Sequence, residues 1–468
     1  MTAITQRLAA FAAGLRLEDV PEEVRERAKL LIVDTVGIAV RARSDAESTP
    51  AMIEALEALG LAAGRASVLG DAASYAPPGA ALANGALAHS LDFDDTHGPS
   101  SLHPSAPVLP AALAAAEMTG ASGTDLLAGV IAGYEVITRI SMALPPGEHY
   151  ARGFHPTATC GAFGATAAAG RVMGLDAERI GHGFGIALSQ AAGSLQFLEN
   201  GAWTKRFQVG AAAMAGLVAA TFASRGYIGA AEALEGRLGF LKGHAPAPDP
   251  ERVVAHLGER WETMRIAVKP YPACRYTHAP MDAIIRLRNE HGLEAADVRR
   301  LVAGLPEKGI LLTGAPLEAK RRPKNVVDGQ FSMPFMAAVA LIRGGMGWDD
   351  YGPCLADAGI MGLAARVEVE NDPEVEAAFP EKLAGSATIE LEDGRTLRAF
   401  VDVPRGEPEA FLSPDELRQK FASLVRPSLG EAGEAALFRA IMDLERTAAT
   451  MLFHHARPSS GLAAAGDD

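Results

Sequence analysis

The sequence predicts a mainly α-helical protein, in which a large all-helical domain is formed by both ends of the chain and a smaller α/β domain lies between them. Hydrophobic residues make up 49% of the 468 residues but aromatic residues only 6%, and alanine and leucine, the strongest helix formers, are abundant. Apolar residues recur at helical spacing through about the first 265 residues. β-branched residues then alternate between about residues 298 and 403, after which the helical pattern returns.

The helices of the large domain can be placed one by one. The first clear helix starts at Pro21, which suits a first turn, and Glu22 and Glu23 complement its N-terminal dipole. Gly and Pro punctuate the pattern that follows. On this spacing we expect further helices at about residues 48–60, 80–92, 106–118, 123–143, 157–173, 177–193 and 206–225.

The smaller α/β domain is expected over residues 267–405. One helix is predicted from His278 to Glu290, and four strands follow, with the sequences VRRLVAGL, ARVEVEN, SATIELE and TLRAFVDV. Asp393-Gly394 lies between the last two strands and is typical of a β-hairpin turn. This part of the chain should therefore contain a small sheet.

The large domain is expected to comprise residues 1–266 and 406–456. Ser413 and Pro414 resemble a helix cap and first turn, and a final helix is predicted from about Ala432 to Ala456. The last residues, 457–468, are of low complexity and are expected to form a disordered tail.

Charge and cysteine content exclude several classes of protein. The formal net charge is -14, which argues against nucleic acid and against anionic membrane surfaces as partners, because both need a clustered basic face. The three cysteines are far apart and show no metal-binding or disulfide pattern. We see no N-terminal signal sequence with a basic region followed by an apolar core. We also see no run of about 18 uncharged apolar residues, the length that a transmembrane helix needs. A cytoplasmic protein is the expectation.

Residues 89–105, HSLDFDDTHGPSSLHPS, concentrate polar side chains in an otherwise apolar chain. If the preceding helix continues through them, His89, Asp92 and Thr96 share one face; a solvated turn is the alternative. A DDxxD magnesium motif fails, because Gly98 stands where its third Asp would be. No HExxH spacing occurs either. We therefore expect no metal and no other cofactor.

Three further stretches carry candidate site residues. GFHPTATCGAF places His155 at the start of a small-residue helix, whose free N–H groups can bind a carboxylate; a tight helix–helix contact would explain the glycines equally well. Lys205 precedes another such helix, and KPYPACRYTH brings together Lys269, Arg275 and His278. Isolated cations of this kind are usually surface charges. Their clustering beside Pro and aromatic residues in an acidic chain favours a small anionic carboxylate substrate.

Taken in order, these stretches resemble the motifs of a known family. NGALAHSLDFDDTH with HPS, GFHPTAT, GAWTKR, KPYPACRYTH and QFSMPF are similar to those of the MmgE/PrpD family, which includes 2-methylcitrate dehydratases, cis-aconitate decarboxylases and an iminodisuccinate epimerase. The likeness spans nearly the whole chain. It implies a helical domain built from both chain ends, an α/β lid domain, a cleft between them, a homodimer, and chemistry without a cofactor.

The resemblance also implies site residues. Two positions depart from what several relatives carry: Gln208 lies in a stretch where they have His-Pro-Gly, and Phe335 replaces an aromatic hydroxyl. Because of these two differences, the exact substrate of the relatives cannot be transferred to this chain. The positions that match the cis-aconitate decarboxylase pattern are Asp92, Thr96, His103, His155, Lys205 and Lys269.

The step that the family's reactions share is proton transfer at a carbon next to a carboxylate or carbonyl group. We expect His103 to be the general acid or base, because histidine titrates near neutral pH, and Asp92 to orient its ring or tune its pKa. Asp94, Asp95 and His97 are expected to shape the turn rather than to contact substrate. His155 is the candidate for a second proton transfer.

The remaining candidates would bind and stabilise charge. Lys205, Lys269 and Arg275 would stabilise the negative charge that develops on the substrate. Thr96 would donate a hydrogen bond to a substrate carboxylate, and His278 is a further candidate for substrate binding.

Three reactions can follow from the shared step. Loss of a β-hydroxyl would make a 2-methylcitrate dehydratase-like hydro-lyase, which we favour because it is the family's commonest assignment. Return of the proton to the other face would make an epimerase or racemase of an aminodicarboxylate, and loss of CO2 would make a cis-aconitate decarboxylase. A non-catalytic carboxylate-binding protein is the alternative from a different class, and His103, Lys205 and Lys269 speak against it.

Overall fold

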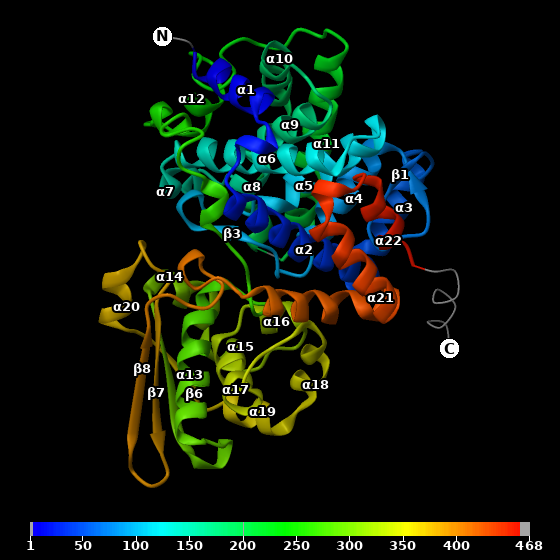
Figure 1. The fold of residues 1–468 in the computed structure, drawn as a ribbon. Helices are drawn as coiled ribbons and strands as arrows, with labels where there is room; N and C mark the ends of the chain where they lie inside the picture. The colour runs from blue at the N-terminus through cyan, green and yellow to red at the C-terminus, as the bar shows by residue number, and fades with distance from the viewer. Residues whose placement is uncertain (1–2, 200, 459–468) are drawn as a thin grey trace. The chain divides into compact units, whose positions relative to one another are not determined.

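The fold is described by a computed structural model that covers residues 3–199 and 201–458 (Figure 1). It divides into two compact units, each with its own contacts: Met1–Ala267 with Pro414–Asp468, and Val268–Ser413. We call them the helical unit and the α/β unit. The predicted fold class, mainly helical with a smaller α/β part, is confirmed.

The helical unit consists of α-helices with a few short β-ladders and isolated β-bridges between its loops. Two short ladders occur in the described residues of this unit: β1 (Ala66–Ser67) with β2 (Ser74–Tyr75), and β3 (Thr96–His97) with β4 (Ile266–Ala267). Its α-helices are α1 Ile4–Gly14, α2 Glu22–Asp45, α3 Thr49–Ala58, α4 Pro77–Ala88, α5 Ser105–Thr119, α6 Gly123–Met142, α7 Pro146–Ala151, α8 Pro156–Thr159, α9 Gly161–Val172, α10 Ala177–Ala187, α11 Thr204–Ser224, α12 Phe240–His244, α21 Pro414–Met442 and α22 Thr450–Ala456.

Small residues bring the central helices of this unit close together. Helix α11 packs on α4, α5, α9 and α10, and Figure 1 shows α4, α5, α9 and α11 side by side in the middle of the unit. Gly210 is needed at one crossing, because a Cβ there would lie 2.2 Å from the Leu82 carbonyl oxygen. The close crossing fixes the first turns of α11 against the end of α4.

Helix α11 is also the one described helix that is long and apolar enough to cross a membrane by length and composition. The expectation that no such apolar stretch exists is therefore wrong. Within the fold, 56% of the most apolar 18-residue window of α11 is buried inside the protein. Its packing on four other helices makes α11 a core helix of the helical unit.

The α/β unit is built on a four-stranded sheet of order β6-β5-β7-β8. β6 runs parallel to β5, and the other neighbours are antiparallel. Helices α13 and α17 pack on the sheet and on each other, as Figure 1 shows for α13 beside β7 and β8. The elements are α13 His278–His291, β5 Val298–Leu305, α14 Glu307–Gly309, α15 Leu317–Lys320, α16 Val326–Gln330, α17 Met333–Arg343, α18 Tyr351–Ala356, α19 Ala358–Ala364, β6 Val367–Asn371, α20 Pro373–Ala378, β7 Gly385–Leu391 and β8 Thr396–Val401.

The predicted hairpin is confirmed, with a longer turn than the two residues expected. β7 pairs antiparallel with β8 up to Glu390 opposite Thr396. The Leu391 N–H then donates to the Arg395 carbonyl, so the turn includes Glu392 to Arg395. Gly394 has φ +91°, which glycine adopts without strain.

Some predicted boundaries differ from the structure. The second unit extends to Ser413 rather than to residue 405, because the segment after residue 405 is tied to it: the Val268 N–H donates to the Gly406 carbonyl. The final helix is interrupted, since α21 ends at Met442 and α22 begins at Thr450. The predicted tail, 457–468, lies outside the described residues from 459 onward.

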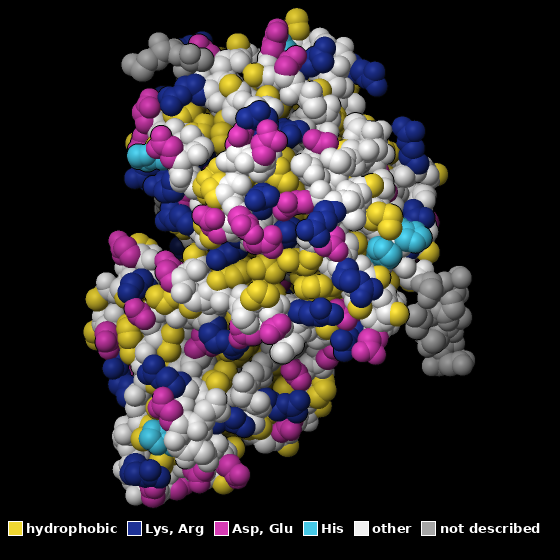
Figure 2. All heavy atoms as spheres, viewed as in Figure 1, with side chains coloured by type: hydrophobic (Ala, Val, Ile, Leu, Met, Phe, Trp, Pro, Cys, Tyr) yellow, Lys and Arg dark blue, Asp and Glu magenta, His cyan; other side chains and the backbone are white. Residues whose placement is uncertain are grey.

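The surface of the protein carries both signs of charge. Figure 2 shows acidic and basic side chains intermixed with hydrophobic ones on the face in view. The chain has 57 acidic and 43 basic residues, so the excess of negative charge is modest relative to the number of charged groups.

Candidate active site

The polar stretch begins where helix α4 ends. The last helical residue is Ala88, and His89 is the C-cap. The predicted continuation of the helix to residue 92 is therefore wrong, and so is the shared helix face of His89, Asp92 and Thr96. Asp92 instead has φ +50°, a left-handed conformation that Asp tolerates better than most residues. This turn redirects the chain, so that successive side chains point to different partners.

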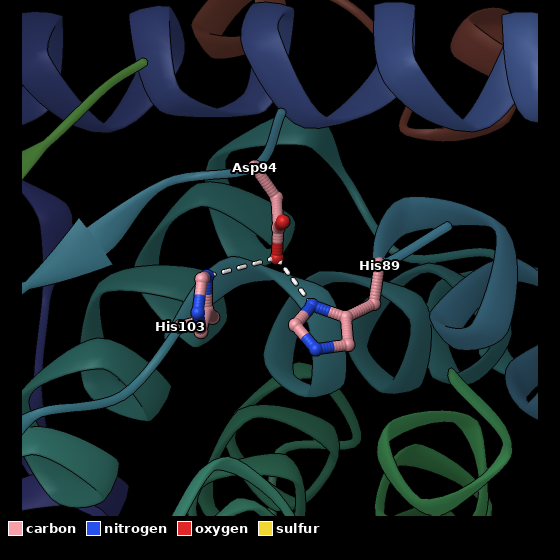
Figure 3. A group of neighbouring side chains, drawn as sticks. All are labelled: His89, Asp94 and His103. Carbon is pink, nitrogen blue, oxygen red and sulfur yellow. Dashed lines mark hydrogen bonds and ion pairs between the residues drawn. The ribbon is translucent and has the colours of Figure 1, made fainter. Parts of the chain in front are cut away.

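Asp94 lies between two histidines that come from opposite ends of this stretch. Nδ1 of His89 is 2.6 Å from Oδ2 of Asp94, and Nδ1 of His103 is 3.2 Å from the same oxygen. Figure 3 shows both contacts meeting at one carboxylate oxygen. The side chains of His89 and Asp94 are fully buried, whereas that of His103 is 19% exposed. His103 is thus the member of the group that a ligand can reach.

The electrostatics of this group keep Asp94 ionised and His89 neutral. Burial alone would raise the pKa of Asp94, but the charges and hydrogen bonds of His89 and His103 outweigh it and hold that pKa well below its usual range. Burial lowers the pKa of His89 to about 4, against the opposing effect of Asp94. A neutral His89 donates its Nδ1–H to the carboxylate. The negative charge of Asp94 is then available to stabilise a protonated His103.

The carboxylate beside His103 is therefore Asp94, and not Asp92 as predicted. Asp92 accepts a hydrogen bond from the ammonium group of Lys205, with 3.0 Å between Oδ1 and Nζ. Lys205 lies in the first turn of α11, and its side chain is 25% exposed. Asp92 thus positions the candidate cation instead of the candidate acid.

His155 lies next to the same group of side chains. Its ring centroid is 5.9 Å from that of His89, and its residue is 5% exposed. Nδ1 of His155 is 3.2 Å from Oε1 of Gln208. Burial, together with the charges of His89, Lys205 and His103, lowers the pKa of His155 well below its usual value.

The backbone of the site loop is held by residues from distant parts of the helical unit. Lys420, on α21, donates to the Phe93 carbonyl at 2.9 Å, and its ammonium lies 3.6 Å from the centre of the Phe93 ring. The same ammonium pairs with Asp34 on α2 at 2.6 Å. The two ends of the chain thus fix the backbone next to Asp94.

The other members of the loop make structural contacts. The Asp95 carboxyl accepts hydrogen bonds from the backbone and hydroxyl of Ser105, and burial raises its pKa to about 8. His97 contacts Ser100 through Nδ1 and Glu262 through Nε2. Thr96 lies in β3, opposite Ala267 of β4. These contacts shape the loop, and the substrate-binding role of Thr96 remains a prediction.

Three predicted site residues, Lys269, Arg275 and His278, belong to the α/β unit. All three are buried. Arg275 pairs with Glu407 and donates to the Val268 carbonyl, and the Nε2–H of His278 donates to the Ala273 carbonyl at 3.2 Å. Contacts inside this unit therefore engage both Arg275 and His278. The functions assigned to the three residues remain predictions.

The group around Asp94 also meets the distance requirement for a metal site. Among the residues that the structure describes, His89, Asp94 and His103 form one group whose ligand atoms lie within 4.8 Å of one another. Both imidazoles, however, direct Nδ1 at a single oxygen, at hydrogen-bond distance. Such contacts require a proton on Nδ1, whereas a metal ligand must be deprotonated. The contact between His89 and Asp94 is a hydrogen bond, and Nδ1 of His103 lies at ion-pair distance from the same oxygen.

The sequence analysis missed His89 and Asp94 as site residues. The available signal was that both residues lie in the polar stretch 89–105, which also contains His103. Which of three neighbouring aspartates meets the histidines depends on the left-handed turn at Asp92. That turn could not be predicted from the spacing alone.

Comparison with known proteins gives full-length matches. Residues 6–253 match the MmgE/PrpD N-terminal domain, and residues 271–445 match the MmgE/PrpD C-terminal domain. A cis-aconitate decarboxylase-like protein, oryM, from Aspergillus oryzae is 28% identical over 95% of both chains. Cis-aconitate decarboxylases from Aspergillus terreus and Homo sapiens are 29% and 27% identical, over 95% of this chain and 93% and 92% of theirs.

Proposed function

We propose that this chain, which belongs to the MmgE/PrpD family and is a lyase, decarboxylates a small unsaturated tricarboxylate of the cis-aconitate type. The relatives described above carry that activity in their names and align over nearly their whole length. From the sequence we favoured 2-methylcitrate dehydration and ranked decarboxylation third. We now favour decarboxylation because of these relatives.

The reaction needs one proton and one site that stabilises negative charge. The bond between the departing carboxylate and its carbon breaks, and its electron pair forms a new double bond between that carbon and the next one. The electrons of the existing double bond move at the same time towards the carboxylate beyond it. A proton then adds to the carbon next to that carboxylate. The products are CO2 and a five-carbon unsaturated dicarboxylate, and the step consumes one proton.

The observation that carries this proposal is the contact between His103 and the buried carboxylate of Asp94. An ionised carboxylate beside Nδ1 stabilises the imidazolium form of His103, which can donate its Nε2 proton to the substrate carbon. Lys205, held by Asp92, supplies a positive charge next to the developing carbanion. Neither contribution requires a group beyond this chain.

A substrate panel tests the proposal directly. Purified protein dialysed against EDTA is incubated with cis-aconitate, citrate, 2-methylcitrate and an aminodicarboxylate, and products are identified by mass spectrometry and NMR. We expect CO2 and the five-carbon dicarboxylate from cis-aconitate, at a rate unchanged by EDTA. Dehydration of 2-methylcitrate without decarboxylation of cis-aconitate would replace the proposal by the hydro-lyase. Inversion of the aminodicarboxylate would replace it by the epimerase.

The same family membership leads us to propose a homodimer. Helix α11 and the turn before it carry three large, substantially exposed hydrophobic side chains: Trp203 is 46%, Phe207 55% and Phe222 49% exposed. Exposed apolar patches of this kind on a soluble protein mark interaction surfaces. A second copy of this chain is the occupant we expect.

Light scattering on a size-exclusion column tests the dimer. We expect a mass twice that of the 48.7 kDa chain, and we expect Phe222→Lys to shift the protein towards the monomer, because a charge replaces apolar contact area. Leu59→Lys is the control, since Leu59 is 71% exposed but lies just after α3. A monomeric wild-type protein at micromolar concentration would refute the dimer.

A further inference from the structure

His155 and Gln208 are joined in a way that determines where the proton of the His155 ring lies. Nδ1 of His155 is 3.2 Å from Oε1 of Gln208, and Nε2 of Gln208 donates to the Ser194 carbonyl at 2.8 Å. A carbonyl oxygen only accepts hydrogen bonds. The amide NH2 of Gln208 must therefore face Ser194, and the amide oxygen must face His155.

The backbone around this pair fixes both partners. The His155 N–H donates to the Gly193 carbonyl at 3.1 Å, and Phe154 is bridged to Ser194. A Cβ at Gly193 would lie 2.6 Å from the Cβ of Ala158, so only glycine permits this close approach. The segment that contains Ser194 is thereby held against the segment that contains His155, with the Gln208 amide in contact with both.

An amide oxygen opposite Nδ1 accepts a hydrogen bond, so Nδ1 must carry the proton. We propose that Gln208 is a positioning residue that keeps His155 in the Nδ1-protonated tautomer. Nε2 of His155 then presents a lone pair to the site and accepts a hydrogen bond from the substrate or from a bound water molecule. This inference rests on the proposed function, in which His103 alone donates the proton.

The two histidines therefore have different roles: His103 donates a proton, and His155 accepts a hydrogen bond. His103 has an ionised carboxylate at Nδ1, whereas His155 has a neutral amide there. A carboxylate stabilises imidazolium with a full negative charge, whereas the hydrogen bond from the Gln208 amide raises the pKa of His155 too little to outweigh burial and the neighbouring charges, which lower it. His155 is therefore an acceptor in the resting enzyme, and it is not poised to protonate a departing hydroxyl group, as a hydro-lyase would require of its second histidine.

The charged and titratable groups that face His155 support the same assignment. His89, Lys205 and His103 each disfavour a positive charge on its ring, and the other ring in contact is the apolar Phe197, at 5.4 Å between centroids. Gln208 is the partner on α11.

NMR of the full-length protein labelled with ¹⁵N-histidine, without substrate, reads the tautomer directly. His155→Asn identifies the His155 signals by their loss. We expect a protonated-type shift for Nδ1 and an unprotonated-type shift for Nε2 in the wild type at pH 7. Gln208→Leu should give a mixture of tautomers, and Gln419→Leu, on an exposed position of α21, should leave the signals unchanged. An Nε2-protonated His155 in the wild type would overturn the inference.

A kinetic test separates positioning from a merely structural role. Gln208→Glu preserves the shape of the side chain but places a carboxylate at Nδ1, which raises the pKa of His155. Only the neutral ring of His155 can accept a hydrogen bond at Nε2 in the role proposed for it, so the acid limb of the pH profile for kcat should move upward, by about one pH unit or more. An unmoved acid limb would contradict the inference. Because the NMR readout needs no substrate, it stands whether or not cis-aconitate is turned over.

Discussion

His103→Ala will reduce kcat for cis-aconitate by about 10²- to 10⁴-fold, the usual contribution of a general acid. His103 is the partly exposed histidine of the group around Asp94, and its Nδ1 is held by that carboxylate. Removing the ring removes the proton donor while leaving Lys205 and Asp92 in place. Steady-state assays of the variant and the wild type, together with circular dichroism to verify folding, measure the effect.

The control for this variant is His454→Ala, an exposed histidine on α22, which should retain the wild-type rate. If His103→Ala also kept the wild-type rate in a folded protein, His103 would not be the proton donor. The mechanism would then need another acid.

Asp94→Asn will reduce kcat by about 10²-fold, because the carboxylate both orients His103 and stabilises its protonated form. Asparagine carries no negative charge and has an NH2 group in place of one oxygen, so it weakens the contacts that His89 and His103 both make with Oδ2 of Asp94. The variant also lacks the negative charge that lies 3.2 Å from Nδ1 of His103 in the wild type. The measurement is a pH–rate profile of the variant against the wild type.

Two neighbouring aspartates supply matched comparisons. Asp95→Asn should retain most of the activity, because burial raises the pKa of Asp95 to about 8 and asparagine resembles its protonated carboxyl group. Asp92→Asn should weaken substrate binding through Lys205 and leave the contact between His103 and Asp94 in place. If Asp94→Asn and Asp95→Asn reduced kcat equally, any substitution in the loop would impair activity to the same extent. Asp94 would then have no specific role in the mechanism.

Most of the fold could be predicted from local sequence patterns. Apolar periodicity located the long helices, and β-branched alternation with Asp393-Gly394 located β7 and β8. The errors fall at the ends of elements and in helices that were not expected, such as α1 and α17. Helix α4 stops at Ala88 although its pattern continues, because a left-handed turn at Asp92 and the contacts of the loop take the chain elsewhere.

The site was predicted only in part, because its decisive contacts are tertiary. Spacing could place His103 and Asp92 in one stretch, but Lys420, more than 300 residues away in sequence, holds the Phe93 carbonyl beside Asp94. Likewise, Gln208 entered the sequence analysis as a departure from relatives, and only the fold reveals its contact with His155. Residue types were predictable here, whereas pairings depended on the packing of distant helices.

The central claim is that His103 delivers one proton to the carbon next to the remaining carboxylate as CO2 departs. The most direct measurement is ¹³C and ²H NMR of the product formed from cis-aconitate in D2O. The account predicts one deuterium per molecule, on the methylene carbon beside a carboxylate, with one equivalent of CO2 released. Turnover without release of CO2, or a product with no deuterium at that carbon, would contradict it.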